Sequence, residues 1–418
     1  MARVVRRLGR DSNLLIAGQG FRATGYGFTA VLLGALLAVR GYSHLQAGIV
    51  LTALIAGNAI ASLVVGRIAD RVGRRRCYAG FFIAVAVAGA TVAAGAPFWL
   101  LLVIGLTGTL STDVVDNGAA TTLEQVMLSA EDAGSATVYG RYNAVGAACG
   151  ALGALAAALP GLGRHGPNAG VNAALFAVLV PVGLAGAVAG WRLSPAVEAP
   201  AGGPSTLGGP STLGRLTLGP SRAVVRRLAA LFAVDAAGGG LVTTGFLSYL
   251  FVQRYGVSLT ALGWLFFAVA GVQAVSVLIA PLLARRFGLV PTMVGTHLPS
   301  NLLLASIAFA PTFPIAALLL LARTTLSQMD VPTRQALVMS VVTPAERTAA
   351  ASVTNAARYS VRPFGPLVAG MLQQLALGAP LLVAGCIKAG YDVALWRWAR
   401  HLPLAGPYTA PLTSGDKP

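Results

Sequence analysis

Long apolar stretches alternate with short polar segments along the whole chain. Each stretch has roughly 20 residues or more, enough at about 1.5 Å per helical residue to cross a hydrocarbon core about 30 Å thick. The pattern therefore predicts an all-α, polytopic membrane protein with twelve transmembrane helices. The expected spans are 13–39, 45–66, 77–95, 98–119, 136–160, 169–191, 226–252, 258–284, 289–310, 312–332, 348–375 and 379–399.

The composition agrees with a lipid environment. Hydrophobic residues make up 56% of the 418 residues and charged residues only 10%, whereas a soluble globular chain carries about 25% charged residues. This chain has too few charges to cover a water-exposed surface, so we expect the lipid bilayer to surround it.

The net charge of +17 would suggest a nucleic-acid partner in a soluble protein, but the positions of the basic residues indicate topology instead. Twenty-one of the 30 basic residues fall in segments on the N-terminal side of the membrane, and Arg40, Arg164 and Arg254 fall on the other side. The positive-inside rule then predicts that both termini are cytoplasmic. The chain uses arginine far more than lysine, which occurs only as Lys388 and Lys417. This preference suggests a GC-rich bacterial gene, and so we expect the protein in the bacterial cytoplasmic membrane.

Residues 192–225 change to a composition rich in Pro, Gly, Ser and Thr, and the hexapeptide GPSTLG at 203–208 recurs at 209–214. Such a segment is typical of a flexible linker. The expected domains are an N-terminal six-helix bundle (1–191), the linker (192–225), a C-terminal six-helix bundle (226–400) and a cytoplasmic tail (401–418).

The two halves repeat each other weakly. A shift of 215 residues brings "GRIADRVGRR", which begins at Gly66, onto "PLLARRFGLV" at 281–290, and a shift of 213 brings Gly25 onto Gly238. Parallel six-helix halves, here two pseudo-symmetric bundles, are typical of a large class of secondary transporter with a substrate site near the membrane midplane.

The loop between the second and third spans resembles the signature loop of the major facilitator superfamily, G-x-x-x-D-R-x-G-R-R/K. The resemblance implies that Asp70 and Arg71 belong to a charge network that latches the two halves together on the cytoplasmic side. Arg75 and Arg76 are better explained as topology anchors. The residues that match the motif are Gly66, Asp70, Arg71, Gly73 and Arg74.

Charged residues inside the spans are the strongest candidates for a site, because each costs at least about 2.5–3.5 kcal/mol at mid-bilayer unless it meets a partner or water. Arg22 and Asp235 lie 213 residues apart, each about nine residues into its span. By the family resemblance, both helices line the central cavity. Their opposite signs suggest an ion pair or a site for a polar substrate, with a purely structural salt bridge as the alternative.

Further in-span charges lie near the ends and middle of other spans. Arg358 and Arg362 share a helix face, which we expect to meet water, an acid or an anionic ligand, and Lys388 and Asp392 suggest a local neutralising pair. The full set expected to bind substrate or a coupling ion is Arg22, Asp235, Tyr26, Asp113, Arg323, Arg358 and Arg362.

Charge complementarity suggests a second inner latch. Glu124, in the connection between spans 4 and 5, and Arg334, between spans 10 and 11, carry opposite charges. We expect a salt bridge between them. Glycines spaced three or four residues apart in 146–161 and 365–370 predict close helix contacts in spans 5 and 11.

No reactive cluster supports an enzyme, and we expect no metal and no cofactor. The three cysteines and four histidines are scattered along the chain. The sequence predicts a monomeric secondary active transporter of a small organic solute that works by alternating access. Efflux of a drug or metabolite is the first expectation, and proton coupling is left open. The alternatives are an uptake transporter or uniporter for a small organic anion and a non-transporting membrane receptor or scaffold.

Overall fold

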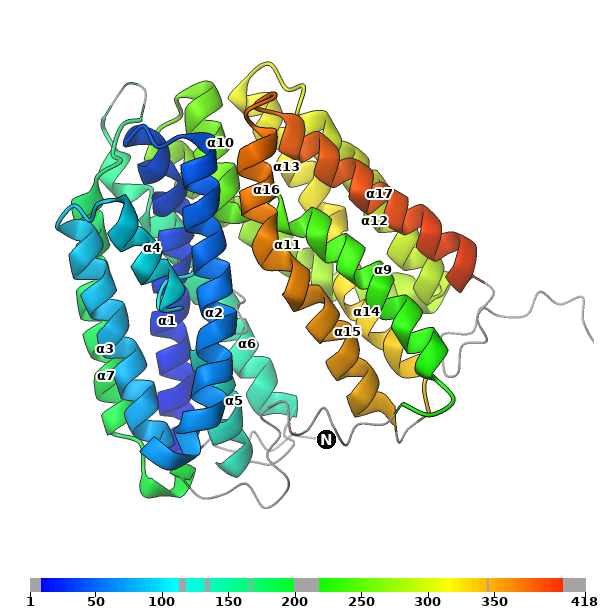
Figure 1. Ribbon diagram of the computed structural model, residues 1–418, viewed down its shortest axis with the longest axis horizontal. Helices are drawn as coiled ribbons and strands as arrows, with labels where there is room; N and C mark the ends of the chain where they lie inside the picture. Colours follow the sequence, from blue (N-terminus) through cyan, green and yellow to red (C-terminus); the bar gives the residue numbers. More distant parts are fainter. Residues whose placement is uncertain are drawn as a thin grey trace, which may run out of the picture. The chain divides into compact units, whose positions relative to one another are not determined.

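The fold is known from a computed structural model that describes residues 9–112, 118–131, 136–164, 166, 168–198, 218–343 and 346–400. Within these ranges all regular structure is helical (Figure 1). The chain forms two compact units: unit 1 comprises Met1–Gly209 and Thr243–Phe267, and unit 2 comprises Pro210–Val242 and Ala268–Pro418. Each unit is described by itself below.

Unit 1 contains the helices of the first half and one helix from beyond the linker. Its α-helices are α1 (Arg10–Val39), α2 (His44–Val72), α3 (Arg74–Ala93), α4 (Phe98–Leu106), α5 (Ala119–Glu131), α6 (Ala136–Ala156), α7 (Leu179–Trp191) and α10 (Thr244–Tyr255). Short 3-10 helices lie before and after α7, namely η2 (Ala173–Val178) and η3 (Pro195–Glu198).

Unit 2 contains most of the second half. Its helices are α9 (Arg222–Gly240), α12 (Leu289–Ile307), α13 (Phe313–Ser327), α14 (Asp330–Ser340), α15 (Arg347–Val361), η5 (Arg362–Phe364), α16 (Gly365–Leu372) and α17 (Ala379–Ala399). The long helix α11 (Leu259–Phe287) begins in unit 1 and ends in unit 2.

The expected spans contain helices, but spans 7 and 11 are divided, into α9 and α10 and into α15 and α16. The helices α5 and α14 lie mostly in the segments that were expected to connect span 4 to span 5 and span 10 to span 11. In span 7 the break follows three consecutive glycines that end α9, and the Thr243 side chain accepts a hydrogen bond from the Phe246 N–H to begin α10. Glycine favours such a stop because it gains the most conformational freedom outside a helix. Among the described residues, eight stretches remain long and apolar enough to cross a membrane.

The boundary between the units differs from the expected one at α10. The sequence places this helix in the C-terminal bundle, yet it packs on α1 in unit 1. The Ser248 hydroxyl donates to the Val31 carbonyl (2.6 Å), and the Tyr249 hydroxyl donates to the Tyr42 carbonyl (2.9 Å). A Cβ on Gly34 would lie 2.0 Å from the Gly245 carbonyl oxygen, so the two backbones approach closely there.

The predicted close contacts of span 5 are confirmed between α1 and α6. A Cβ built on Gly27 would lie 2.0 Å from the Gly150 carbonyl oxygen, and one on Gly153 would lie 2.1 Å from the Thr24 carbonyl oxygen. Any larger residue at these positions would separate the helices. The same holds in span 11, where Gly365 lies against the backbone of Gly240.

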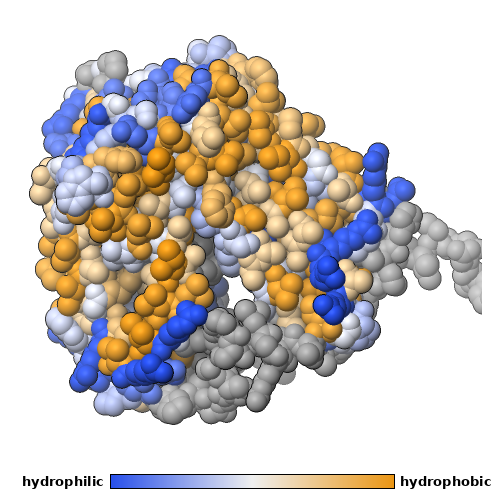
Figure 2. Space-filling view, viewed as in Figure 1, coloured by the Kyte–Doolittle hydropathy of each residue, from blue (hydrophilic) through white to orange (hydrophobic). Residues whose placement is uncertain are grey.

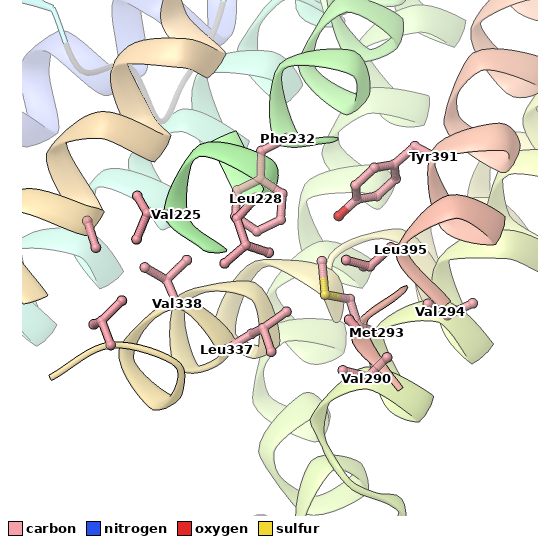
Figure 3. Close-up of a cluster of buried hydrophobic side chains, with 13 residues drawn as sticks. Val225, Leu228, Phe232, Val290, Met293, Val294, Leu337, Val338, Tyr391 and Leu395 are labelled. Carbon is pink, nitrogen blue, oxygen red and sulfur yellow. The ribbon is translucent and has the colours of Figure 1, made fainter. Parts of the chain in front are cut away.

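A hydrophobic cluster in unit 2 holds five helices together (Figure 3). It joins side chains of α9, α12, α14, α15 and α17, among them Phe232, Met293, Leu337 and Tyr391. Outside this core, apolar residues cover much of the visible surface and hydrophilic residues gather in separate patches (Figure 2). Leu278 on α11 is 75% exposed, as expected for a helix face in contact with lipid.

Candidate functional site

Unit 1 buries one ion pair between its first helix and α5. The Arg22 guanidinium, on α1, donates through Nη2 to Glu124 Oε2 at 2.8 Å. The two side chains are 1% and 0% exposed. Arg22 also donates to the amide oxygen of Gln19, one turn earlier on the same helix, and its Cζ lies 5.5 Å from the centre of the Tyr26 ring.

Two phenols complete the surroundings of Glu124. The Tyr78 hydroxyl, on α3, donates to Oε1 at 2.8 Å, and the Tyr142 hydroxyl, on α6, donates to Oε2 at 2.5 Å. With Arg22, the carboxylate therefore has donors from three helices. Hydrogen bonds to a charged acceptor are stronger than neutral ones, so this arrangement fixes the Glu124 side chain between α1, α3 and α6.

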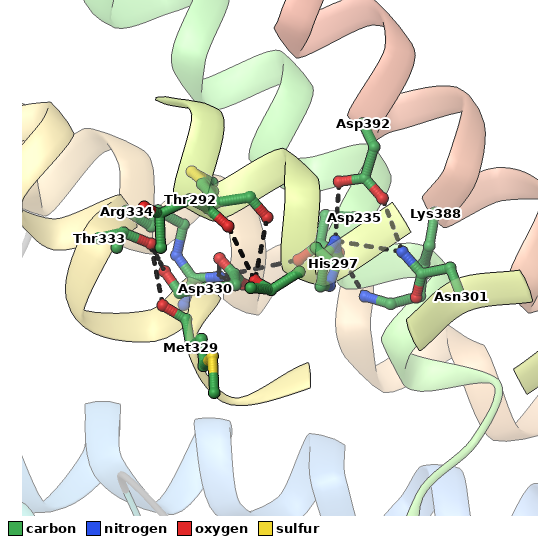
Figure 4. A network of polar contacts seen from close by, with 12 residues as sticks. Asp235, Thr292, His297, Asn301, Met329, Asp330, Thr333, Arg334, Lys388 and Asp392 are labelled. Carbon is green, nitrogen blue, oxygen red and sulfur yellow. Dashed lines mark hydrogen bonds and ion pairs between the residues drawn. The ribbon is translucent and has the colours of Figure 1, made fainter. Parts of the chain in front are cut away.

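Unit 2 buries a larger network around Asp235 of α9 (Figure 4). Lys388, on α17, donates to Asp235 Oδ1. The same carboxylate lies 3.8 Å from His297 Nε2, on α12, and 3.9 Å from Arg334 Nη1, on α14. Asp235 is thus shared among three basic side chains from three different helices.

Two further carboxylates extend this network on either side. His297 Nδ1 lies 2.8 Å from Asp392 Oδ1, and the Asn301 amide donates to Asp392 Oδ2 at 2.8 Å. Arg334 donates to Asp330, one turn earlier on α14, at 2.6 Å. The imidazole of His297 therefore lies between two acids, Asp392 and Asp235.

More positive than negative charge surrounds Asp235. Arg323, on α13, and Arg358, on α15, are close enough to interact electrostatically with this carboxylate. The Arg323 Nε is buried and has no hydrogen-bond partner among the described residues. The unit 2 cluster, as we define it, has four cations and three carboxylates: Arg323, Arg334, Arg358 and Lys388 with Asp235, Asp330 and Asp392.

The structure places the expected residues in these networks but pairs them differently. Arg22 and Asp235, which were expected to form an ion pair or a site for a polar substrate, each have an oppositely charged partner in their own unit. The same is true of Glu124 and Arg334, so the predicted latch between those two stays a prediction. Lys388 donates to Asp235, whereas Asp392 accepts from Asn301 and contacts His297, so the local pair expected on α17 is replaced by contacts to neighbouring helices.

Other expected site residues are less central. Arg362 lies half-buried in η5, and Tyr26 stacks beside Arg22. Asp113 and Asp116 lie outside the described residues. Asn58, on α2, donates to the Leu54 carbonyl one turn earlier and to the Leu110 carbonyl beyond the end of α4, while its Oδ1 has no hydrogen-bond partner among the described residues.

Sequence reasoning missed the residues that complete both networks. The histidines were judged to be scattered, but His297 and Asn301 lie four residues apart in an apolar span and so share one helix face. That polar pair was the available signal. No comparable signal marks Tyr78 or Tyr142, because buried tyrosines are common in apolar helices and their hydroxyl partners depend on the fold.

The loop between α2 and α3 departs from the expectation in one respect. Arg74 Nε donates to Asp70 Oδ1 at 2.9 Å, while Arg71 is exposed. The acid that accepts from the exposed N–H groups of α3 is Glu198, at 2.7 Å from the Arg74 nitrogen and 3.0 Å from the Arg75 nitrogen. The N–H groups at the start of α3 therefore bind Glu198, while Asp70 pairs with Arg74, and the latch expected of Asp70 and Arg71 stays a prediction.

The two glycines of this loop that match the motif, Gly66 and Gly73, also differ. Gly73 has φ of 103° where α2 ends and α3 begins, a conformation that residues with a Cβ rarely adopt. A Cβ on Gly66, by contrast, would meet nothing within 4 Å. Only Gly73 is required by the backbone geometry.

Helices with buried charges and apolar outer faces, arranged in two units, define a membrane-embedded transporter fold. The family model for the Major Facilitator Superfamily matches residues 15–366. The chain belongs to this superfamily, which confirms the resemblance seen in the loop at 66–76.

Known relatives and solved structures agree with this assignment. An uncharacterized membrane protein of Saccharomyces cerevisiae, YJR124C, is 25% identical over 393 residues, which cover 87% of this chain and 88% of that protein. The crystal structure of the nucleoside transporter NupG matches with a TM-score of 0.71 at 15% identity, covering 93% of this chain and 97% of that one. The human organic anion transporter MFSD10 matches with a TM-score of 0.59 at 19% identity, covering 93% and 100%. At these identities the two structural likenesses show the fold alone.

Proposed function

We propose that this protein is a secondary active transporter that moves a small organic solute with a negative charge by alternating access. The observation that carries this proposal is the excess of cations in the unit 2 cluster. Four cations face three carboxylates there, and a buried nitrogen of Arg323 lacks a hydrogen-bond partner among the described residues.

An anionic ligand would supply what this cluster lacks. A buried charge is costly unless it is paired and hydrogen-bonded. Arginine presents a planar fork of donors that suits carboxylate, sulfonate and phosphate groups. Arg323 and Arg358 are therefore the residues proposed to contact the negative group of the solute, with Arg362 half-buried in the following turn of the chain.

This proposal narrows the alternatives left open by the sequence. Efflux of a drug or metabolite and uptake of a small organic anion differ in direction, and the cation excess bears only on the charge of the solute. Direction, residence in the bacterial cytoplasmic membrane, cytoplasmic termini and the monomeric state remain predictions. A receptor or scaffold would bind such a solute without moving it.

Ligand binding and transport can be measured with matched probes. Benzoate, benzenesulfonate and succinate test the negative charge, and benzamide is the neutral counterpart of benzoate. We expect at least one anion to raise the unfolding temperature of the purified protein more than benzamide does, and Arg323→Gln to weaken that effect. Arg67→Gln, on the exposed side of α2, is the matched control and should leave it unchanged.

Counterflow of the same radiolabelled anion in proteoliposomes then separates transport from binding alone. Exchange that requires the protein supports a transporter, whereas binding without exchange would support the receptor alternative. Equal effects of benzamide and all three anions would overturn the proposed negative charge of the solute. Comparing inside-out with right-side-out vesicles gives the direction.

A further inference from the structure

One histidine in unit 2 is placed between acids from two helices other than its own. His297, on α12, is 2% exposed. Its Nδ1 lies 2.8 Å from Asp392 of α17, and its Nε2 lies 3.8 Å from Asp235 of α9. The edge of the ring also contacts Tyr391 in a T-shaped arrangement, with the ring centres 6.0 Å apart. Helix contacts therefore fix both ring nitrogens toward carboxylates (Figure 4).

We propose that His297 is a proton-binding site whose occupancy controls how Asp235 is shared with Lys388 and so tunes the affinity of the unit 2 cluster for an anion. The first part depends only on the geometry of α9, α12 and α17. The second part rests on the proposed function. Histidine suits such a role because it is the side chain whose charge ordinarily changes between about pH 5 and 8.

The hydrogen bonds assign the positions of the protons on the neutral ring. Asp392 Oδ2 accepts from Asn301, whose amide nitrogen also lies 3.1 Å from His297 Nδ1. With the Asp392 carboxylate ionised, the 2.8 Å contact between Oδ1 and Nδ1 is a hydrogen bond only if the ring proton is on Nδ1. Nε2 is then left as a bare acceptor facing a second carboxylate. The incoming proton forms an N–H bond at Nε2, and the new donor points toward Asp235.

Several charged or titratable groups from neighbouring helices face this site. Asp235 comes from α9, Lys388, Tyr391 and Asp392 come from α17, and Asp330 and Arg334 come from α14, with Arg323 of α13 and Arg358 of α15 in electrostatic reach of Asp235. No other histidine is among them.

Counting the bonded groups shows what one proton does. The three carboxylates of Asp235, Asp330 and Asp392 are bonded to two cations, Lys388 and Arg334, so the bonded groups alone carry one negative charge. Arg323 and Arg358, which lie in electrostatic reach but are not bonded to these carboxylates, give the whole cluster its excess of cations. A proton on His297 cancels the negative charge of the bonded groups. Asp235 then has a donor in addition to Lys388, and its attraction for Arg323 and Arg358 is partly cancelled.

Protonation should therefore favour anion binding at the two arginines. Since linkage between two binding sites is reciprocal, a bound anion must favour proton uptake by the same factor. A cycle that moves both together would drive solute in the direction of the proton gradient. This coupling uses the second half of the chain and needs none of the charges of unit 1.

Nuclear magnetic resonance can test the proton site without any ligand. The chain has four histidines, so the triple variant His44→Gln/His165→Gln/His401→Gln retains only His297 and leaves the network intact. With labelled histidine in lipid nanodiscs, we expect its ring signals to shift as the pH is lowered from 9 to 5. Signals that stay constant from pH 5 to 9 would overturn the proton site.

Anion binding tests the coupling. Benzenesulfonate stays ionised across this range, so its own charge does not confuse the result. We expect it to bind at least about 5-fold more tightly at pH 5.5 than at pH 8, the lower end of ordinary coupling between sites. His297→Gln should abolish the difference, and His44→Gln should preserve it.

The outcomes separate the two proposals. Binding of benzenesulfonate with equal affinity at both pH values, or a pH dependence that survives in His297→Gln, would overturn the coupling while supporting the anion site. Failure of every anion to bind would overturn the proposed substrate class. In that case the titration of His297 in the triple variant still decides whether the proton site exists.

Discussion

The two units carry the same pair of positions with the charges exchanged. Arg22 on α1 and Asp235 on α9 lie 213 residues apart, and Glu124 on α5 and Arg334 on α14 lie 210 residues apart. Unit 1 thus has an arginine on its leading helix and an acid on α5, whereas unit 2 has an acid on its leading helix and an arginine on α14. The distances differ as well: 2.8 Å for Arg22 to Glu124 and 3.9 Å for Arg334 to Asp235.

The difference shows that charged residues at equivalent positions can have fixed or exchangeable partners. We call a carboxylate locked when all its donors are within hydrogen-bond distance, and adjustable when some of them are farther away. Glu124 has one cation and two phenols, all within hydrogen-bond distance. Asp235 has one close cation, Lys388, and two basic groups beyond 3.5 Å. A carboxylate whose partners compete can change partner when one of them gains a proton, and a carboxylate with short bonds to every donor cannot.

The largest effect should follow from breaking the locked pair. Arg22→Met leaves Glu124 buried without its cation, and losing one partner of a buried pair costs about 3–5 kcal/mol. We expect the free energy of unfolding, measured by denaturant titration in detergent micelles, to fall by that amount. Arg67→Met, which changes an exposed arginine on α2, should stay within about 0.5 kcal/mol of the parent.

The double variant Arg22→Met/Glu124→Met distinguishes an ion pair from simple packing. It removes both charges, so we expect it to recover much of the stability lost in the single variant. A double variant less stable than Arg22→Met alone would show that the two residues do not act as a pair.

A smaller and pH-dependent effect is expected when the cation of the adjustable network is removed. Lys388→Met leaves Asp235 with Arg334 and His297, so the cost at pH 8 should be about 1–3 kcal/mol, the penalty for an incompletely satisfied buried group. At pH 5.5 a protonated His297 replaces the missing cation, and the deficit should shrink. Unfolding titrations at the two pH values check this, and a deficit that is equal at both would contradict the adjustable network.

The sequence predicted the helices and the charged positions far better than the contacts between them. Apolar length alone predicts each span, and the depth of Arg22 and Asp235 predicts that both are buried near a site. The partner of Arg22 is Glu124, about 100 residues later in the chain, and the partner of Asp235 is Lys388, about 150 residues later. A repeat alignment relates equivalent positions of the two halves but contains no information on which helices pack together within each half.

The same limit applies to the loop between α2 and α3 and to the position of α10. The motif indicates a charged loop, but the acceptor for α3 comes from Glu198, over 120 residues later. The break after Gly240 is visible in the sequence as three glycines. The hydrogen bonds of Ser248 and Tyr249 to the backbone carbonyls of Val31 and Tyr42 are not visible there, because every residue has such a carbonyl.

Two buried tyrosines, one in each unit, allow the two networks to be compared through smaller changes in the free energy of unfolding. Tyr142 donates to Glu124, whereas the buried hydroxyl of Tyr391 has no hydrogen-bond partner among the described residues. Tyr142→Phe removes a bond to a charged group and should cost about 1.5–3 kcal/mol. Tyr391→Phe removes an unsatisfied hydroxyl, so we expect no loss and at most a small gain in the free energy of unfolding. Equal losses in the two variants would refute the contrast between the networks.

The smallest expected effect lies at the start of α9, where Glu346 accepts from the Ser221 hydroxyl at 2.7 Å and from the Gly219 N–H. The hydrogen bond from Ser221, more than any other contact, lowers the pKa of Glu346 below its usual value. A carboxyl with a lowered pKa in the folded state stabilises that state above its unfolded pKa, about 4.3, and loses this contribution as the pH falls through the folded value.

Ser221→Ala should raise the pKa of Glu346 toward its ordinary value, and the share of stability that disappears below about pH 4.5 should shrink. Unfolding temperatures at pH 7 and pH 4 measure that share, and Ser360→Ala, whose hydroxyl donates to the Ala357 carbonyl on its own helix, is the control. Unit 1 fixes the start of α3 in a related way, since Glu198 accepts from two backbone N–H groups there. If Ser221→Ala leaves the pH dependence unchanged, the hydrogen bond from Ser221 does not lower the pKa of Glu346. The starts of α9 and α3 would then resemble each other only in having an acid nearby.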